Sequence, residues 1–566
     1  MRVFKKRHEK GTKMKRILIL IISLMLVITL VACAGTSDKG DGSGTGSSTS
    51  GIGTDPAQDD TTEDSEQTPP PSDTDAVTTY LDRTEPEPEL DAPLTVEDPK
   101  TLAIDSSVRH QVIESFGASG AWWAQYAGSN TKTRDHIAEL LFDPVNGIGL
   151  NSYRYNVGAG SRDKSTNSPA ITDPRRRAYS FERSPGEYNW NRDKAAIWFM
   201  EKAVELGVDE IVMFANSPLE RLTKNGNAYG NPGYVSNIDP ENYEAFATYL
   251  LDVAEHFKSE GLPVKFISPI NEPAFEWSGG QEGSHYSDKE VIALLKVFVE
   301  EIGKREGLRG VEISGPEGSS WRNSPSQWED DTLGLCQRIM KDSTLKNYFT
   351  SLDAHSYWST KDAKKNFIKG ITKVAPDIKL RQTEWCEMKG ANEGQDAVGK
   401  LAMPSGLTIA EVIHEDMTIL DCVSWSFWTA VSAGDYGDGL VYTDGNSNNV
   451  KTSKRLWSMG NYSRYIDRGY TRVDCGGGTI NILVSAYEGI NEYGEPETVI
   501  VIVNKNKDEK GFNFSGIDTS VYNRISVVTT DKTHDLEETY YSEFVDGTAI
   551  SVPGESVTTV IISGRK

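Results

Sequence analysis

The feature that most constrains the fold is a regular alternation between residues 114 and 465. Short runs rich in apolar and β-branched residues alternate with longer segments, such as 193–207, 241–261 and 288–307, whose apolar residues recur every three or four positions. Such alternation is typical of repeated strand and helix units around a parallel sheet. The strand-like runs lie at residues 114–123, 150–160, 209–217, 264–273, 310–321, 352–358, 379–387 and 422–431. Eight such units in one domain predict an α/β fold, a (β/α)8 TIM barrel spanning residues 114–465.

The C-terminal segment has a different pattern. Residues 466–566 contain strand-like runs with period-two alternation, separated by Gly, Asn and Asp turns. Residues 100–113, just before the first barrel strand, also have the pattern of a strand. We therefore predict a β-sandwich at the side of the barrel, formed by residues 466–566 and joined by the strand at 100–113.

Residues 1–33 have the pattern of an export signal. Basic residues precede a long apolar run that ends in Leu-Val-Ala-Cys, which matches a bacterial lipobox. We expect Cys33 to be lipidated and to become the mature N-terminus of a protein anchored at the cell surface. An uncleaved signal anchor is the alternative, because the apolar run approaches the ~20 residues that span a bilayer. Both interpretations place the rest of the chain outside the cytoplasm.

Residues 34–99 consist mostly of Gly, Ser, Thr, Asp and Pro. Because so few large apolar side chains cannot offset the entropy lost on ordering, we predict a disordered acidic linker. The whole chain carries a formal net charge of −24, which argues against nucleic acid or anionic lipid as a partner. The five cysteines form no C-x-x-C pair, so the sequence predicts neither a metal site nor a disulfide framework, and no cofactor is expected.

Polar side chains close most of the predicted strands. In a barrel of this type, catalytic groups lie at the carboxyl ends of the strands. The residues at these ends are Arg154 and Asn156 on the second strand, Asn216 and Ser217 on the third, Asn271 and Glu272 on the fourth, His355 and Tyr357 on the sixth, Glu384 on the seventh, and Trp425 and Trp428 on the eighth. Carboxylates on the fourth and seventh strands are expected to face one another across the barrel mouth.

Two carboxylates with aromatic neighbours are what glycoside hydrolysis requires, since one protonates the leaving oxygen and the other meets an oxocarbenium-like centre. Arg154 and Tyr357 would keep Glu384 ionised as a nucleophile through charge and hydrogen bonding. Glu272 would hold a proton as the acid, and Asn271 would hydrogen-bond the 2-hydroxyl of the sugar. A carboxyl separation of about 5 to 5.5 Å would then indicate retention of configuration.

Other residues are candidates for binding the sugar. They are Asn216, His355 and the tryptophans Trp122, Trp123, Trp277, Trp385 and Trp428, whose apolar faces suit stacking on sugar rings. Simpler interpretations remain open, because Asn-Glu-Pro is often only a turn, a histidine can be structural and any tryptophan can belong to the core. Glu384 could instead pair with Arg381 or Lys389, and Glu387 competes with it for the role of nucleophile.

Several of these motifs together resemble glycoside hydrolase family 30, a retaining family of the large (β/α)8 glycosidase clan. The motifs are FGASGAWW at the first strand, YRYNVGAG at the second, NSP at the third, PINEP at the fourth, HSYW at the sixth and TEW at the seventh. The resemblance covers roughly residues 100 to 566 and implies a barrel with a side β-sandwich. It also implies that Glu272 is the acid/base and Glu384 the nucleophile.

Within the family, NEPAFEWSGGQEGSHY after the fourth strand is similar to the endo-β-1,6-galactanase branch, although Ser284 stands where that branch is expected to have Cys. The segment SAGDYGDGLVYTD after the eighth strand is acidic, which argues against a grip on a glucuronate branch and so against the glucuronoxylanase branch. The resemblance therefore implies a β-linked polysaccharide as substrate, most simply β-1,6-galactan. Glucuronoxylanase, β-1,6-glucanase and exo-β-glycosidase activities are the alternatives within the family.

Two further classes of function are open to the sequence alone. A noncatalytic glycan-binding protein would use the surface tether and the β-sandwich equally well, but carboxylates at both catalytic positions argue against it. A cysteine hydrolase could use Cys386 as its nucleophile, but no histidine near it in sequence offers a base.

Overall fold

The computed structural model describes residues 89–163, 170–323, 331–388, 402–434 and 436–564. All of them belong to one unit of the chain, Thr79–Lys566. The predicted signal at residues 1–33, with Cys33, and most of the predicted linker lie outside the described residues. Within the described part of the chain, no helix is long and apolar enough to cross a membrane.

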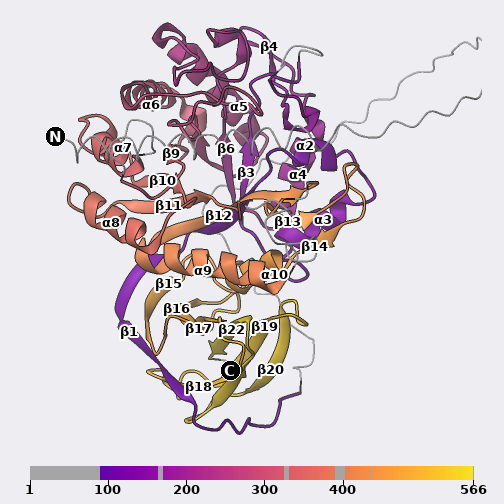
Figure 1. Ribbon diagram of the computed structural model, residues 1–566, viewed down its shortest axis with the longest axis vertical. Coiled ribbons are helices and arrows are strands. Elements are labelled where there is room, and N and C mark those ends of the chain that lie inside the picture. The colour runs from indigo at the N-terminus through magenta and orange to yellow at the C-terminus, as the bar shows by residue number, and fades with distance from the viewer. Residues whose placement is uncertain (1–88, 164–169, 324–330, 389–401, 435, 565–566) are drawn as a thin grey trace, which may run out of the picture. The chain divides into compact units, whose positions relative to one another are not determined.

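The first part of the chain forms a curled sheet of parallel strands, seen in the upper half of Figure 1. Its strands are β2 (Ser115–Ser119), β3 (Ser152–Asn156), β6 (Glu210–Phe214), β7 (Val264–Ser268), β8 (Glu312–Ile313), β9 (Pro316–Gly318), β10 (Ser351–His355), β11 (Lys379–Glu384) and β12 (Cys422–Ser432). Each overlaps one of the eight predicted runs, and the run at 310–321 contains both β8 and β9. Nearly all their side chains are buried, as expected for a parallel sheet with covered faces.

The order of the strands brings the two ends of this sheet together. Hydrogen bonds link the strands in the order β8-β7-β6-β3-β2-β12-β11-β10-β9, so the first and last members are neighbours in the chain, separated by Ser314 and Gly315. The N–H of Ser314 donates to the carbonyl of Ile267 at 2.9 Å, and the carbonyl of Gly315 accepts from Asp353 at 3.0 Å. One short stretch of chain therefore connects β7 to β10, and the carboxyl ends of all these strands share one edge.

Helices follow the strands and cover the sheet. They are α2 (Ala124–Ala127), α3 (Arg134–Phe142), α4 (Lys194–Glu205), α5 (Tyr243–Ser259), α6 (Asp288–Ile302), α7 (Thr332–Ile339), α8 (Lys361–Ile371), α9 (Met403–Ile419) and α10 (Lys454–Ser463). The three segments predicted to be helical contain α4, α5 and α6. Helix α6 begins with a capping box, in which Ser287 and Glu290 bond each other's backbone N–H groups, an arrangement that stabilises a helix start by about 1 kcal/mol.

Two small hairpins were not predicted from the sequence. The first consists of β4 (Glu182–Ser184) and β5 (Glu187–Tyr188) in the long connection after β3. The second consists of β13 (Gly439–Tyr442) and β14 (Lys451–Thr452), and β13 runs parallel to the end of β12. These strands have two to four residues each, which is too short for a period-two pattern to be recognisable.

The C-terminal part of the chain and the early strand β1 form a β domain, in the lower half of Figure 1. Its nine strands are β1 (Lys100–Val112), β15 (Thr471–Gly476), β16 (Ile482–Ile490), β17 (Pro496–Asn504), β18 (Lys510–Ser515), β19 (Arg524–Thr530), β20 (Glu537–Glu543), β21 (Ala549–Val552) and β22 (Ser556–Ser563). The strand expected at 100–113 is β1, which pairs antiparallel with β15 and parallel with β18.

This domain differs from a sandwich of two separate sheets. Hydrogen bonds join all nine strands into one sheet, in the order β20-β19-β22-β17-β16-β15-β1-β18-β21. Every strand contributes a side chain to one shared apolar core, from Leu102 of β1 to Ile562 of β22. A single sheet whose strands all face one core must curve around it, because sheets twist and coil. Period-two alternation predicts the buried face of each strand but not how many sheets the strands form.

The linker prediction extends too far at its C-terminal end. Asp91, which the sequence assigns to the linker, bonds β20 twice through Tyr541: its N–H donates to the carbonyl at 2.7 Å, and its carboxylate accepts from the N–H at 2.8 Å. The hydroxyl of Ser542 donates to the Asp91 carbonyl at 3.0 Å. Asp91 is therefore bound to the β domain, because its hydrogen bonds to β20 order a polar segment that composition alone marks as disordered.

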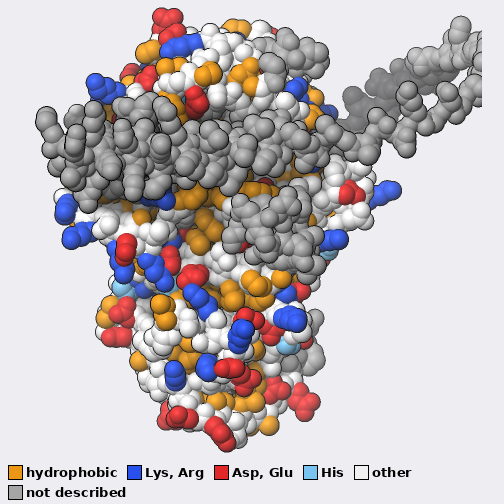
Figure 2. Space-filling model, in the orientation of Figure 1, with side chains coloured by type: hydrophobic (Ala, Val, Ile, Leu, Met, Phe, Trp, Pro, Cys, Tyr) orange, Lys and Arg blue, Asp and Glu red, His pale blue; other side chains and the backbone are white. Residues whose placement is uncertain are grey.

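The β domain packs against α9 and α10. Asn461 of α10 donates from Nδ2 to the hydroxyl of Thr559 at 3.0 Å, and that hydroxyl donates to the carbonyl of Asn461 at 2.6 Å. These three polar groups are buried and satisfy one another across the junction. Figure 2 shows acidic and basic side chains interspersed over this lower part of the molecule, so the face in view presents no extended surface of one sign there.

Candidate active site

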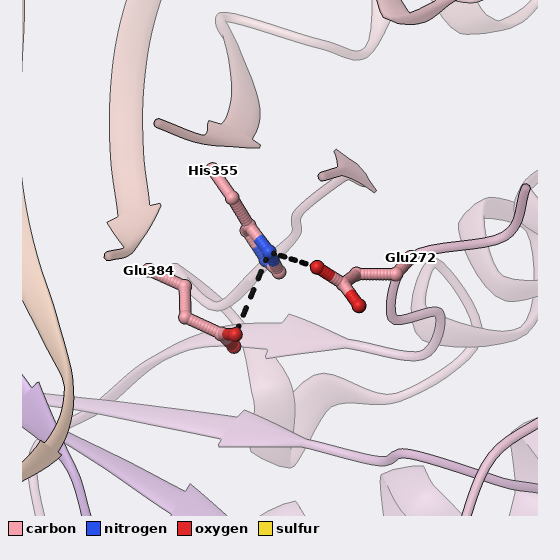
Figure 3. A group of neighbouring side chains, drawn as sticks. All are labelled: Glu272, His355 and Glu384. Carbon is pink, nitrogen blue, oxygen red and sulfur yellow. Dashed lines mark hydrogen bonds and ion pairs between the residues drawn. The ribbon is translucent and has the colours of Figure 1, made fainter. Parts of the chain in front are cut away.

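Two glutamates meet at the carboxyl edge of the parallel sheet. Glu272 lies just beyond the end of β7, and Glu384 is the last residue of β11. Both side chains are buried, with exposed fractions of 7% and 4%. One carboxylate oxygen of each glutamate and a ring nitrogen of His355 all lie within 4.8 Å of one another (Figure 3). The two carboxylates therefore converge, as the strand-end pattern predicts.

The backbone at this edge is strained. Glu272 and Glu317 have φ angles of 43° and 57°, in the left-handed region that costs a residue with a side chain about 1–3 kcal/mol. The N–H of Glu272 donates to the carbonyl of Glu317 at 2.9 Å, so the two strained residues support each other. Strain of this kind concentrates at functional sites, where it directs a side chain into a required position.

Glu384 has the two partners that the sequence predicted. Arg154 Nη1 donates to one carboxylate oxygen at 2.8 Å, and the Tyr357 hydroxyl donates to the other at 2.9 Å. Burial raises the pKa of Glu384 above its ordinary value, while the positive charges of His355 and Arg154 oppose this shift. Arg154 and Tyr357 therefore act on Glu384 in the expected direction, and His355 adds a third contribution against the effect of burial.

His355 is a charged bridge between carboxylates. Its ring is fully buried, with Nδ1 at 3.1 Å from Glu272 and 3.6 Å from Glu384, and Nε2 at 3.1 Å from Glu317. Burial alone lowers the pKa of an imidazole, but these three carboxylates raise that of His355 to about 10.

The side chains of Glu272, His355 and Glu384 are close enough to surround a cation. An imidazolium with both N–H groups facing carboxylates has no lone pair to offer a metal ion. The chemistry of this donor set therefore fits a proton on His355 better than a bound metal.

Glu317 is the residue that sequence reasoning missed. It is completely buried and accepts hydrogen bonds from His355, from the hydroxyl of Ser268 at 2.8 Å and from the hydroxyl of Thr383. Burial raises the pKa of a carboxyl, but Arg154 at 3.5 Å and these donors lower that of Glu317 to about 2. The available signal was the Pro-Glu pair in the fifth run, which resembles the Asn-Glu-Pro of the fourth.

The two predicted asparagines have different surroundings. Asn271 Oδ1 accepts a hydrogen bond from Arg154 Nη2 at 3.1 Å, which ties its amide to the carboxylate cluster. Asn216 donates to Asn156 at 3.0 Å, and its own Oδ1 is buried with no hydrogen-bond partner among the described residues. A buried amide oxygen without a donor costs about 1–3 kcal/mol, so a substrate hydroxyl would be a favourable partner for Asn216.

The tryptophans separate into two groups. Trp122 and Trp428 meet edge to face with ring centroids 5.1 Å apart, and Trp277 donates from Nε1 to the carbonyl of Glu272 at 3.1 Å. Trp123, by contrast, is only 1% exposed and packs in the core against Phe199. The prediction that Trp123 offers a face to sugar was wrong, because the chain turns into α2 here and directs neighbouring side chains differently. Trp385 and Trp428 are also buried, with exposed fractions of 7% and 8%.

The surroundings of Glu387 and Cys386 argue against either residue as the nucleophile. Glu387 is buried against Arg455 at 3.1 Å. Cys386 is also buried, which raises the pKa of its thiol well above the ordinary value and disfavours the reactive thiolate. Its thiol, like that of Cys422, is free of any disulfide.

The described structure does not contain the alternative ion pair between Glu384 and Arg381. Arg381 pairs with Glu114 at 2.6 Å and with Glu210 at 2.8 Å, at the opposite end of the strands. Lys389 lies outside the described residues. Glu384 is thus paired with Arg154 within the site.

Comparison with known proteins identifies a family. A family model described as O-glycosyl hydrolase family 30 matches residues 99–442. An endo-β-1,6-galactanase of Hypocrea rufa is 25% identical over 394 residues, covering 65% of this chain and 75% of that protein. A glucuronoxylanase of Bacillus subtilis is 25% identical over 332 residues, covering 57% of this chain and 66% of that protein.

Solved structures share the fold. A conserved exported protein from Bacteroides fragilis has a TM-score of 0.72 at 23% identity, covering 82% of this chain and 100% of the other. The catalytic domain of a family 30 xylanase from Talaromyces cellulolyticus has a TM-score of 0.62 at 20% identity, with the same coverage.

Proposed function

The chain belongs to glycosyl hydrolase family 30 and is a glycosidase; from this premise we propose that it cleaves β-linked glycans with retention of configuration. The observation that carries the proposal is the short distance between the two carboxylates, whose nearest oxygens lie within 4.8 Å. Retaining enzymes need about 5–5.5 Å between carboxyl groups, whereas inverting enzymes need about 6.5–9.5 Å to admit a water molecule. Oxygens of Glu272 and Glu384 within 4.8 Å of each other fit the shorter of these carboxyl spacings better than the longer one, which supports the retaining mechanism.

In the first step of this mechanism, a Glu384 carboxylate oxygen attacks the anomeric carbon while the glycosidic C–O bond breaks. Glu272 gives its proton to the departing oxygen, which leaves as an alcohol, and an ester joins the sugar to Glu384. The surroundings suit these roles. Arg154 and Tyr357 direct both oxygens of Glu384, and His355 stabilises negative charge on either glutamate.

In the second step, the Glu272 carboxylate takes a proton from water, whose oxygen attacks the anomeric carbon. The ester bond breaks and Glu384 is released as a carboxylate. Two inversions at one carbon give net retention. Asn271, whose amide oxygen accepts a hydrogen bond from Arg154, is proposed to hydrogen-bond the 2-hydroxyl of the reacting sugar.

We propose β-1,6-galactan as the substrate. The support is the galactanase-like segment after β7 and the similarity to the endo-β-1,6-galactanase of Hypocrea rufa. Glucuronoxylan is the second candidate, because a glucuronoxylanase is also a relative of the chain. The acidic segment after β12 disfavours it, since uronate branches carry negative charge.

A panel of polysaccharides tests both the activity and the substrate. The experiment measures reducing sugar released from β-1,6-galactan, glucuronoxylan, β-1,6-glucan and a β-1,4-linked control glycan. We expect release from β-1,6-galactan by the wild-type protein and none by the Glu384→Gln variant, which removes the nucleophile. Binding of a glycan without release of reducing ends would assign the protein to the noncatalytic class instead.

We further propose that the curled parallel sheet is the (β/α)8 barrel predicted from the sequence, with β8 and β9 as the two halves of its fifth strand. The protein is proposed to be a lipoprotein anchored at the outer surface of a bacterial membrane through Cys33. The lipobox-like sequence supports this location. The test is labelling of cells that express the wild-type protein or the Cys33→Ala variant with radioactive palmitate. We expect label on the wild type and none on the variant, and equal labelling of both proteins would contradict the lipid anchor.

A further inference from the structure

An aromatic surface lies on the loops that follow β6 and β7. Tyr234 and Phe275 are 41% and 43% exposed. The ring centroid of Phe275 lies 5.2 Å from that of Trp277, and the ring of Tyr234 lies 5.8 Å from that of His285. His285 joins the two pairs, because its Nδ1 is 3.2 Å from the carbonyl oxygen of Phe275. These four residues, Tyr234, Phe275, Trp277 and His285, are called the aromatic platform below.

The platform begins at the acid/base residue. The carbonyl of Glu272 accepts one hydrogen bond from the backbone N–H of Phe275 at 3.0 Å and another from the Trp277 indole at 3.1 Å. The paired rings of Trp122 and Trp428 are linked to the strand that carries Glu384. The N–H of Trp428 donates to the carbonyl of Trp385, the residue after Glu384. Exposed aromatic surface is thus found beside Glu272, where Phe275 is 43% exposed, whereas Trp428 is only 8% exposed.

The platform is built into the fold. Trp277 has a φ of 52°, and its carbonyl accepts from the N–H of Gly230 at 2.7 Å. Gly283 lies under the indole so closely that a Cβ there would come within 2.6 Å of the Trp277 side chain. Such close packing fixes the orientation of the ring, which is what a binding surface requires and what an accidental exposed aromatic lacks.

The loop that carries Gly283 is itself anchored. Glu282 is buried and accepts hydrogen bonds from the N–H of Ala159 at 3.0 Å, and from the N–H and hydroxyl of Ser161 at 3.1 and 2.6 Å. The loop after β7 is thereby tied to the chain that follows β3. The QEG-x-H segment of the sequence therefore has a physical role, which is to hold the platform beside Glu272.

Accepting the retaining mechanism proposed above, we propose that the aromatic platform binds the sugar residues on the leaving side of the scissile bond. The acid protonates the leaving oxygen, so the departing sugars lie on the side of Glu272. Exposed aromatic rings suit the apolar faces of sugars, and an exposed apolar surface at a catalytic residue marks a ligand site.

The test compares substrates that differ only in the number of sugars on the leaving side. The kcat/KM of wild type and of Phe275→Ala is measured on an aryl glycoside and on oligosaccharides of the glycan that the wild type cleaves. We expect the variant to lose about tenfold or more on oligosaccharides with two or more leaving-side sugars, with a much smaller loss on the aryl glycoside. Ile490→Ala, at an exposed position of β16 in the β domain, is the control and should match wild type on both.

A readout without turnover separates this inference from the proposed function. Isothermal titration of the same oligosaccharides into Glu384→Gln protein should give binding weakened about tenfold by adding Phe275→Ala. Equal loss on all substrate lengths, or unchanged oligosaccharide binding, would overturn the platform proposal while leaving the glycosidase assignment intact. A changed oligomeric state of Phe275→Ala with wild-type kinetics would assign the surface to contacts between protein chains, and would also overturn it.

Discussion

Replacing Glu317 by Gln should change the titration of His355 and, through it, the pH range of activity. In the wild type, His355 Nε2 lies 3.1 Å from the Glu317 carboxylate, and the carboxylates around the ring raise the pKa of His355 to about 10. Glutamine keeps the shape of the side chain and one acceptor oxygen but removes the charge. It also turns one acceptor into a donor facing the groups around Glu317, so the variant removes the charge together with at least one accepted hydrogen bond.

The magnitude follows from the distance. At 3.1 Å and an effective dielectric constant of about 20, Coulomb attraction between the two unit charges is about 5 kcal/mol, equivalent to about 4 pKa units. Because the amide oxygen still accepts a hydrogen bond, we expect roughly half of this shift, which lowers the pKa of His355 to about 8. Glu272 and Glu384 remain beside the ring, so His355 stays protonated at neutral pH.

The sign of the stability effect follows from linkage. The pKa of His355 in the folded wild type lies above its value in an unfolded chain, so its ion pairs stabilise fully below about pH 6.5. Their contribution is lost as the pH rises through about 10 in the wild type, and through about 8 in the variant. Loss of one partner from a buried charge pair should also lower the free energy of unfolding by about 3–5 kcal/mol.

The assay is the dependence of kcat/KM on pH for an aryl glycoside, together with a carbon-13 NMR titration of labelled histidine. We expect the alkaline limb of the Glu317→Gln profile to move to lower pH by about 2 units. Glu210→Gln is the matched control, because Glu210 is equally buried and paired with Arg381 but lies at the start of β6. The reasoning is refuted if Glu317→Gln only loses stability and keeps the wild-type pH profile, or if Glu210→Gln shifts the profile equally.

Two smaller predictions concern the loop that holds the platform. Burial raises the pKa of Glu282 to about 7, so the folded protein binds an extra proton between about pH 4.5 and 7, and its stability falls as the pH rises through this window. Glu282→Gln should therefore flatten the dependence of Tm on pH in this window, and an unchanged slope would contradict the role given to Glu282. Gly283→Ala places a Cβ within 2.6 Å of the Trp277 side chain, so tryptophan fluorescence should change and the free energy of unfolding should fall by about 1–3 kcal/mol. A wild-type spectrum and Tm would show that the loop adjusts to the added methyl group and does not fix the Trp277 ring.

The sequence predicted the parts of the site that depend on strand ends. Arg154, Asn271, His355, Tyr357 and Glu384 were identified because each closes an apolar run, and parallel strands bring their carboxyl ends to one edge. Their partners could be inferred as well, since a buried carboxylate needs a cation or a donor.

Other features depend on tertiary contacts that no local pattern reports. Glu317 was missed because the fifth run is divided between β8 and β9, and because its role depends on His355, which is 38 residues away in sequence. Trp123 was misassigned because a pair of adjacent tryptophans gives no sign of which one faces the core. The single sheet of the β domain and the pairing of Asp91 with β20 likewise arise from hydrogen bonds between distant segments.

The most direct test of the mechanism is the product that the Glu272→Ala variant forms from an aryl glycoside in the presence of azide. Without its acid/base the variant should still form the ester at Glu384, because an aryl leaving group departs without a proton. Azide needs no base and should restore turnover, and NMR of the product should show a β-glycosyl azide, the result of two inversions. An α-glycosyl azide would show a single inversion, and would contradict Glu384 as the nucleophile of a retaining enzyme.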